Sequence, residues 1–339
     1  MQAGIIYSFD FYRFSHLALI VSLNRDRPRP CALADIAIAW GMRILPTLLF
    51  AAAFLAAFTS AQAKTACALP TPCEVTGENG GTYYVAAPED WDGNGGLKPF
   101  VFYHGHSGSG AGVAKNKGLA KSLAEQGYLL IAPDGPMLRY RNRETRGWPA
   151  RVQGEIKRSD RNDVKFTEAV LRDVAQRFKL NLDDTVISGF SSGGSMAWHF
   201  SCYSTMQVAG VVPVAGALRR PHPNNGVVQA DGSIARFCPG GPRKVVHIHG
   251  WSDKQVPLEG RGIGEWHQGD VFASLDVQRR TNRCNSRPDM VEAKGPFWCR
   301  AFTSCETGQA VKFCLHPGGH GMPQGWLETG LNGLSNPGN

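Results

Sequence analysis

Short apolar runs alternate with longer amphipathic runs along most of this chain, and this alternation leaves few possible folds. It predicts parallel strands joined by crossover helices, and so an α/β fold with a mostly parallel central sheet in a single domain. The expected strands are Thr82–Ala86, Phe100–Tyr103, Tyr128–Ala132, Thr185–Ser188, Val211–Val214, Val245–His249 and Val311–Leu315. The expected helices are Val113–Gln126, Asp163–Phe178 (with Asn162 as its N-cap), Gly193–Cys202 and Val271–Arg280. Met137–Arg161 and Arg219–Pro242 lack periodicity and are expected to be long loops near the ligand-binding ends of strands.

Residues 42–63 have the features of a targeting segment. Ile44–Phe58 is apolar, follows Met42-Arg43 and precedes Ala61-Gln62-Ala63, the order found in a secretory signal peptide. The alternative, a membrane anchor, needs roughly 20 apolar residues. We expect a signal peptide at 42–63, cut near Ala63, and a non-native N-terminal extension at 1–41. A catalytic domain at 64–339 would then be secreted, extracellular or periplasmic, with no stable membrane insertion.

Cysteine content agrees with export. Eight of the nine cysteines follow the expected cut, and an oxidising compartment favours disulfides. Spacing does not determine the pairing, and the two shortest loops, Cys67–Cys73 and Cys299–Cys305, are the first candidates. The formal net charge is +8, and no basic patch with interleaved aromatics accompanies it, so nucleic acid is not expected as a partner. The oligomeric state is not predicted.

The segment Gly189-Phe190-Ser191-Ser192-Gly193 carries the strongest chemical signal. It lies between an expected strand and an expected helix, which is the setting of the nucleophile elbow of α/β-hydrolases. A serine hydroxyl needs a base to become nucleophilic, and in this fold the acid and then the histidine follow the serine in the chain. Ser191 is therefore the expected nucleophile.

His320 and Asp253 are the expected partners of Ser191. His320 lies in a glycine-flanked loop after the last expected strand, and His316, at the end of that strand, is its main competitor. Asp253 follows the strand Val245–His249 through a short turn. The other carboxylates considered are simpler to explain as solvated groups: Asp231, Asp270, Asp276 and Asp289.

Two backbone N–H groups are expected to bind the oxyanion. One belongs to Ser192, the residue after the nucleophile, and the other to His106, in the loop after Phe100–Tyr103. A competing hypothesis uses the pairs His104/His106 and His247/His249 as a metal site. No carboxylate cluster joins these pairs, so neither a metal nor an organic cofactor is expected.

An arginine-rich segment follows Pro133-Asp134-Gly135. Its arginines are Arg139, Arg141, Arg143, Arg146 and Arg151, beside Tyr140 and Trp148. The segment is either a solvated loop or a lid that recognises acidic esters, since arginine pairs with carboxylates. Trp148, Arg141, Arg143 and Arg146 are accordingly candidate substrate contacts.

Several motifs together resemble a known family. They are Tyr103-His104-Gly105, Pro133-Asp134-Gly135, Gly189–Gly194, His249–Asp253 and Gly318-Gly319-His320. Their order resembles polyhydroxybutyrate depolymerase-like esterases, which are α/β-hydrolases similar to feruloyl and acetylxylan esterases. The resemblance covers roughly residues 80–325. It implies hydrolysis of carboxylic esters by Ser191, Asp253 and His320 without a cofactor.

The chain departs from the family pattern at three places. Trp251 replaces a smaller residue and becomes a candidate substrate contact, His106 replaces a small residue, and no polymer-binding module is expected after residue 325. We therefore expect a secreted serine carboxylesterase that forms an acyl-enzyme on short hydroxyalkanoate oligomers or similar soluble esters. One alternative is a feruloyl or acetylxylan esterase acting on plant polysaccharide. An alternative of another class is a non-catalytic envelope binding protein on a hydrolase scaffold.

Overall fold

The computed structural model describes residues 66–140, 143–149, 161–221, 227–228, 234–263 and 266–338. The chain divides into two compact units, and every described residue belongs to the second, Ala52–Asn339. The expected N-terminal extension and signal peptide lie outside the described residues.

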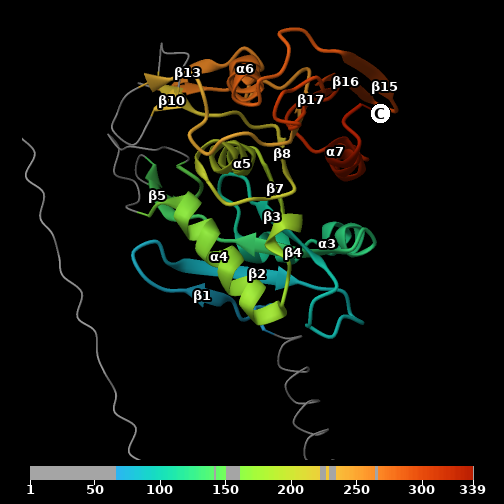
Figure 1. Cartoon of the computed structure of the whole chain (residues 1–339). Helices are drawn as coiled ribbons and strands as arrows, with labels where there is room; N and C mark the ends of the chain where they lie inside the picture. Colours follow the sequence, from blue (N-terminus) through green and yellow to red (C-terminus); the bar gives the residue numbers. More distant parts are fainter. Residues whose placement is uncertain are drawn as a thin grey trace, which may run out of the picture. The chain divides into compact units, whose positions relative to one another are not determined.

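A ten-stranded sheet organises the second unit (Figure 1). In spatial order its strands are β1 (Cys73–Val75), β2 (Gly81–Ala86), β4 (Tyr128–Pro133), β3 (Lys98–Tyr103), β7 (Val186–Phe190), β8 (Gly210–Val214), β12 (Val245–Gly250), β17 (Val311–His316), β16 (Phe297–Phe302) and β15 (Met290–Lys294). The pairs from β4 to β17 are parallel, and the flanking pairs at both edges are antiparallel. The predicted mostly parallel sheet is confirmed, and each predicted strand forms within two residues of its expected bounds.

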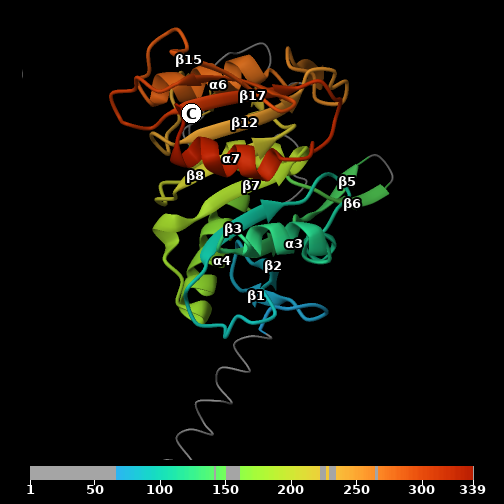
Figure 2. The ribbon, with the colours of Figure 1, turned by 90° about the vertical axis from the view of Figure 1, so that its right-hand side faces the viewer.

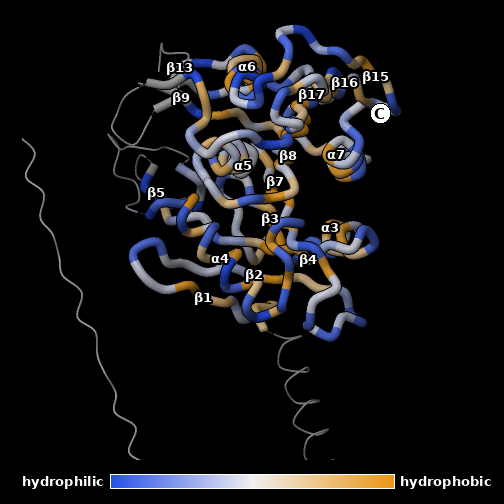
Figure 3. Tube along the Cα trace, viewed as in Figure 1, coloured by the Kyte–Doolittle hydropathy of each residue, from blue (hydrophilic) through white to orange (hydrophobic). Residues whose placement is uncertain are grey.

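Helices cover both faces of this sheet. They are α2 (Gly110–Ala114), α3 (Lys117–Ala124), α4 (Asp163–Phe178), α5 (Ser192–Tyr203), α6 (Val271–Thr281) and α7 (Trp326–Ser335), with a 3-10 turn η1 at Leu182–Asp184. Residues of α4, α5 and α6 belong to one hydrophobic cluster, and residues of α3 and α7 to another. Figure 2 looks at the sheet from the side of α3 and α7, and Figure 3 shows hydrophobic residues concentrated in the central strands. No described helix is long and apolar enough to cross a membrane.

Some elements differ from expectation. The predicted helix Val113–Gln126 is two helices, because the Asn116 side chain accepts the N–H of Leu119 and starts α3 as a new N-cap. Sequence reasoning missed the strands β15 and β16 and the helix α7. In β16, buried and exposed residues alternate, which is the signature of a half-buried strand.

The two expected long loops contain short strands. In the first, β5 (Met137–Tyr140) and β6 (Arg143–Arg146) form an antiparallel hairpin. In and after the second lie β9 (Arg220–Pro221), β10 (Val227–Val228), β11 (Ile234–Ala235), β13 (Arg261–Ile263) and β14 (Trp266–Gln268), which form two small sheets. Within Arg139–Arg151, the positions Arg141, Asn142, Ala150 and Arg151 lie outside the described residues.

Four disulfides join all eight cysteines after the expected cut: Cys67–Cys73, Cys202–Cys238, Cys284–Cys305 and Cys299–Cys314. The Cys67–Cys73 prediction is confirmed, and the Cys299–Cys305 prediction is wrong. Strand register explains the error, because Cys299 and Cys314 are directly opposed on β16 and β17, whereas Cys305 faces Cys284 in an isolated bridge. The complete pairing fits a protein of an oxidising compartment.

Loop length predicts which disulfide stabilises the fold most. Cys202–Cys238 spans 36 residues and Cys67–Cys73 spans 6, and a longer closed loop removes more entropy from the unfolded chain. Replacing both cysteines of the 36-residue loop with alanine should lower the free energy of unfolding by about 2–4 kcal/mol. The same change at Cys67–Cys73 should cost about 1–2 kcal/mol less. Urea unfolding measures both, and equal losses would contradict the loop-length account.

Candidate active site

Ser191 occupies a strained turn between β7 and α5. Its φ is 58° and its ψ is −118°, a conformation that side chains rarely adopt. The turn is tight, since a Cβ on Gly189 would lie 2.5 Å from the Gly193 oxygen, and one on Gly193 would lie 2.1 Å from the Tyr103 oxygen. Both glycines are therefore required where they stand, and the hydroxyl of Ser191 lies beyond the end of the strand.

The structure brings Ser191, His320 and Asp253 together. His320 Nε2 lies 2.8 Å from Ser191 Oγ, and His320 Nδ1 lies 2.7 Å from Asp253 Oδ2. Ionised carboxylate oxygens only accept hydrogen bonds, so Nδ1 carries the ring proton and Nε2 is free to accept the proton of the serine hydroxyl. This is the geometry of a nucleophile, a base and an orienting acid.

Asp253 is held as a buried anion. Its Oδ1 accepts the backbone N–H groups of Gln255 and Val256 at 2.8 and 2.9 Å, and it is only 5% exposed. Burial alone would raise the pKa of Asp253, but hydrogen bonds from His249, His320 and Val256 outweigh burial and hold that pKa well below its usual range. Asp253 therefore stays charged over the pH range in which a histidine works as a base.

The loops that carry Asp253 and His320 are bound to each other. The N–H of Trp251 donates to the His316 carbonyl at 2.8 Å, and the N–H of Ser252 donates to the Gly318 carbonyl at 3.1 Å. A Cβ on Gly250 would lie 2.1 Å from the Gly319 oxygen, so only glycine permits this approach. The distance between acid and histidine is thus set by backbone contacts between adjacent parallel strands.

The two expected oxyanion donors belong to segments that adjoin the nucleophile. Ser192 is the first residue of α5, where a backbone N–H has no partner within the helix. Gly105 packs against the elbow, because a Cβ there would lie 3.7 Å from Cβ of Ser191, and His106 is the next residue. A backbone hydrogen bond holds the loop that carries His106 in place, because the Ser107 N–H donates to the Arg146 carbonyl at 2.9 Å.

Trp148 is not a substrate contact, and this prediction is corrected. It is 1% exposed, its ring packs on Tyr103 and His104, and its indole N–H donates to the His104 carbonyl at 3.0 Å. An aromatic ring with one donor is stable in the core when that donor finds a carbonyl. Trp148 therefore supports the strand and loop that lead to His106.

The described arginines of the hairpin differ in availability. Arg146 donates to the Gly135 carbonyl at 3.0 Å and lies 3.9 Å from Asp134. Arg139 and Arg143 are exposed. The prediction that Arg146 binds substrate therefore competes with an internal role in fixing the hairpin to the Pro133-Asp134-Gly135 turn.

Three of the four histidines in these pairs, His104, His247 and His249, make hydrogen bonds within the protein. His104 Nε2 accepts the N–H of Gly135 at 2.9 Å, and His247 Nε2 lies 3.0 Å from His249 Nδ1. No group of three or more potential metal ligands occurs among the residues that the structure describes. Sequence reasoning considered His249 as a metal ligand and among the candidate histidines after Ser191, and missed its contact with Asp253, where Nε2 and Oδ2 lie 3.3 Å apart.

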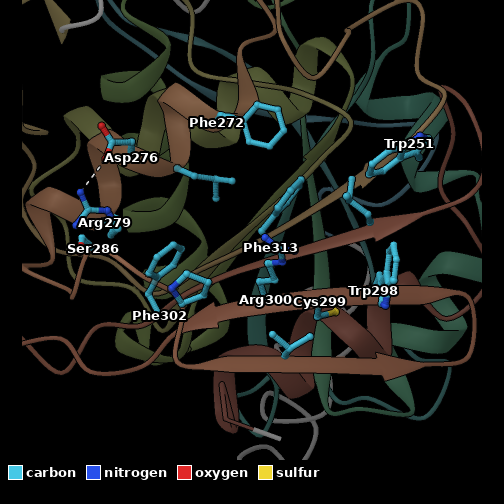
Figure 4. Close-up of a pocket in the computed structure, with 14 residues that line it drawn as sticks. Trp251, Phe272, Asp276, Arg279, Ser286, Trp298, Cys299, Arg300, Phe302 and Phe313 are labelled. Atoms are coloured by element: carbon cyan, nitrogen blue, oxygen red, sulfur yellow. Dashed lines mark hydrogen bonds and ion pairs between the residues drawn. The ribbon is translucent and has the colours of Figure 1, made fainter.

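Trp251 stands at one end of a large open groove (Figure 4). The groove has a volume of about 560 Å³ and runs between α6 and the outer strands β15–β17. Its aromatic lining is Trp251, Phe272, Trp298, Phe302 and Phe313. Trp251 is 62% exposed and Trp298 is 65% exposed. The groove lies where the sheet continues with β16 and β15 beyond β17, the strand that α6 contacts.

Comparison with solved structures fits this architecture. The acetyl xylan esterase from Aspergillus awamori superposes with a TM-score of 0.52 at 13% identity, covering 76% of this chain and 99% of that protein. The chain has the α/β-hydrolase fold. No family model matches the sequence.

The chain is similar in sequence to proteins named as esterases. A feruloyl esterase C of Aspergillus niger is 26% identical over 73% of this chain and 79% of its own length. The esterase NocK of Nocardia uniformis is 28% identical over 46% of this chain, and the match spans only 40% of that relative's length. The predicted resemblance to esterases of the α/β-hydrolase fold is confirmed. The predicted enzyme class, a hydrolase of carboxylic ester bonds, is confirmed as well. The hydroxyalkanoate part of that expectation stays a prediction.

Proposed function

We propose that the chain is a secreted serine carboxylesterase in which Ser191 is the nucleophile, His320 the base and Asp253 the orienting acid. The observation that carries this proposal is the continuous set of short contacts from Ser191 Oγ through His320 to Asp253. The export part rests on the signal-like segment at 42–63, and the four disulfides support it.

The geometry suits a two-step mechanism. Ser191 Oγ attacks the acyl carbon while its proton passes to His320 Nε2, and the carbonyl oxygen becomes an oxyanion beside the N–H groups of Ser192 and His106. The resulting imidazolium gives its proton to the departing alcohol, leaving an acyl-enzyme. Water then attacks the acyl carbon by the same route and releases the acid. Asp253 remains ionised throughout and stabilises the imidazolium.

The substrate class has two candidates. The resemblance stated from sequence favours short hydroxyalkanoate esters. Similarity to proteins named feruloyl esterase and acetyl xylan esterase supports the second candidate, an ester borne on plant polysaccharide. The arginine clamp predicted at Arg141, Arg143 and Arg146 would favour an ester that carries a carboxylate. In the structure, Arg146 also donates to the Gly135 carbonyl.

A substrate panel tests the proposal. The mature protein should hydrolyse p-nitrophenyl butyrate, and a Ser191→Ala variant should not. Rates on hydroxybutyrate oligomers, methyl ferulate and acetylated xylo-oligosaccharide then separate the substrate classes. A protein that binds these esters but hydrolyses none of them would instead be the non-catalytic binding protein.

Trp251 and Trp298 should matter only for large substrates. The groove they line starts beside the Asp253 loop, so it can hold the part of a substrate that does not react. Each aromatic face buried there is worth about 1–2 kcal/mol. The double variant Trp251→Ala/Trp298→Ala, which loses two such contacts, should therefore lower kcat/KM for an extended ester about 30- to 1000-fold. The same variant should change p-nitrophenyl acetate hydrolysis by less than about threefold.

Phe237 provides the matched control for this prediction. It is 54% exposed, close to the 62% of Trp251, and does not line the groove. Phe237→Ala should leave the hydrolysis of both the extended ester and p-nitrophenyl acetate unchanged. If the double tryptophan variant lost equal activity on small and extended esters, we would conclude that the groove does not bind substrate.

A further inference from the structure

A row of buried rings connects α5 to the acid of the active site. The indole N–H of Trp198 donates to His247 Nδ1 at 3.1 Å, His247 Nε2 lies 3.0 Å from His249 Nδ1, and His249 Nε2 lies 2.8 Å from the Val256 carbonyl. His249 Nε2 also lies 3.3 Å from Asp253 Oδ2. Both histidines have no exposed surface, so the row is sealed from solvent.

The proton positions in this row follow from one residue. An indole nitrogen can only donate, so His247 Nδ1 is an acceptor and the proton of His247 is on Nε2. That N–H must donate to His249 Nδ1, which is therefore an acceptor as well. His249 then carries its proton on Nε2, facing the Val256 carbonyl and Asp253. Each ring is neutral, since a protonated imidazole would have a hydrogen on both nitrogens.

We propose that Trp198, His247 and His249 form an ordered hydrogen-bond chain that keeps an uncharged donor against Asp253, which makes His249 a positioning residue of the active site. This role rests on the proposed serine esterase function. The chain does two things for catalysis. It fixes Oδ2 of Asp253 where His320 Nδ1 meets it, and it excludes a second cation beside the carboxylate.

Excluding that cation preserves the charge of the active site. A cationic His249 would need a hydrogen on Nδ1, directly opposing the N–H of His247. Asp253 therefore keeps a full negative charge to stabilise the His320 imidazolium that forms during turnover. Burial and the neighbouring His249 lower the pKa of His247 well below its ordinary value, in agreement with the neutral ring.

The surroundings of the row contain few other titratable groups. His316, on β17, faces His249 and Asp253, and burial, the largest cause, lowers the pKa of His316. His320 lies on the far side of Asp253. Phe313 stacks on His247 with centroids 5.7 Å apart and planes at 29°, which holds the ring in the plane that the hydrogen bonds require.

Ring protonation is measured directly by NMR of ¹⁵N-histidine protein. Two-bond ¹⁵N–¹H correlations distinguish neutral Nε2–H, neutral Nδ1–H and doubly protonated rings, and His247→Gln and His249→Gln assign the signals. Both rings should be neutral and should carry their single proton on Nε2 in the native protein. Trp198→Phe, which removes the indole donor, should give mixed tautomers. A doubly protonated or Nδ1–H ring at either residue in the wild type overturns the proposal, whatever the fate of the esterase assignment.

Kinetics test the positioning role. His249→Leu should lower kcat on p-nitrophenyl butyrate about 10- to 100-fold with KM within about twofold, because Asp253 loses a donor. The acid limb of kcat/KM should move to higher pH, since a carboxylate with fewer donors attracts the His320 proton more strongly. His249→Gln, which can accept from His247 and donate to Asp253, should restore both the rate and the acid limb.

His199→Leu is the matched control. His199 is also buried, on α5, at 5% exposure, and its Nδ1 has no hydrogen-bond partner among the described residues. The His199→Leu variant should leave the pH dependence of kcat/KM unchanged. The proposal fails if His249→Leu lowers kcat no more than His199→Leu does, or if His249→Gln restores neither property in a folded protein.

Discussion

Ser191→Ala is expected to lower kcat for p-nitrophenyl butyrate by about 10⁴-fold or more. Alanine removes the attacking oxygen and leaves His320 and Asp253 in place, so no covalent intermediate can form. The expected remainder is the weaker catalysis that oxyanion donors and binding provide on their own.

The same variant should remain folded. Alanine occupies the strained turn as easily as serine does, and the close contacts of Gly189 and Gly193 are unchanged. A serine-directed phosphonate should label the wild-type protein once, at Ser191, and should not label the variant. Retention of more than about one per cent of the wild-type rate would remove Ser191 as the nucleophile.

Asp253→Asn should lower kcat by about 10³- to 10⁴-fold, nearly as much as Ser191→Ala does. Oδ1 of Asp253 accepts two backbone N–H groups, so the oxygen of an asparagine would stay on that side. Its NH₂ group would then face His320 Nδ1 and donate to it. The proton of His320 would move to Nε2, and the ring could no longer accept the serine proton.

This substitution also acts on the row of histidines. The new NH₂ group would oppose the Nε2–H of His249, which now has Asp253 Oδ2 within 3.3 Å. Asp289→Asn is the matched control, because Asp289 likewise accepts two backbone N–H groups, from Thr303 and Ser304, and its pKa is lowered to about 2 by hydrogen bonds that outweigh burial. If Asp289→Asn and Asp253→Asn gave similar rates, the effect would be structural and the assignment of Asp253 would be lost.

Local features made much of this protein predictable from sequence. The apolar runs became strands within two residues of their expected bounds, because burial on both faces of a parallel sheet demands continuous apolar residues. The nucleophile elbow at Ser191 could also be predicted from the sequence. Its glycines are required by contacts within the turn and with one adjacent strand, and these recur wherever a serine is presented in this way. Asp253 and His320 were predicted as partners of Ser191 because each lies in the loop after a strand.

Contacts between distant segments were decided only by the tertiary structure. Cys299 pairs with Cys314 rather than with Cys305 because the register of β16 on β17 opposes them. Trp148 packs in the core because its indole N–H finds the His104 carbonyl.

The same holds for His249. It was considered as a metal ligand, and its partners Trp198 and Asp253 come from a helix and a loop that only the packed sheet brings to it. Sterics within a turn and the burial of a strand depend on neighbouring residues, so the sequence displays them. Strand register and side-chain partners depend on how whole helices and strands pack together, and the sequence pattern does not show this packing.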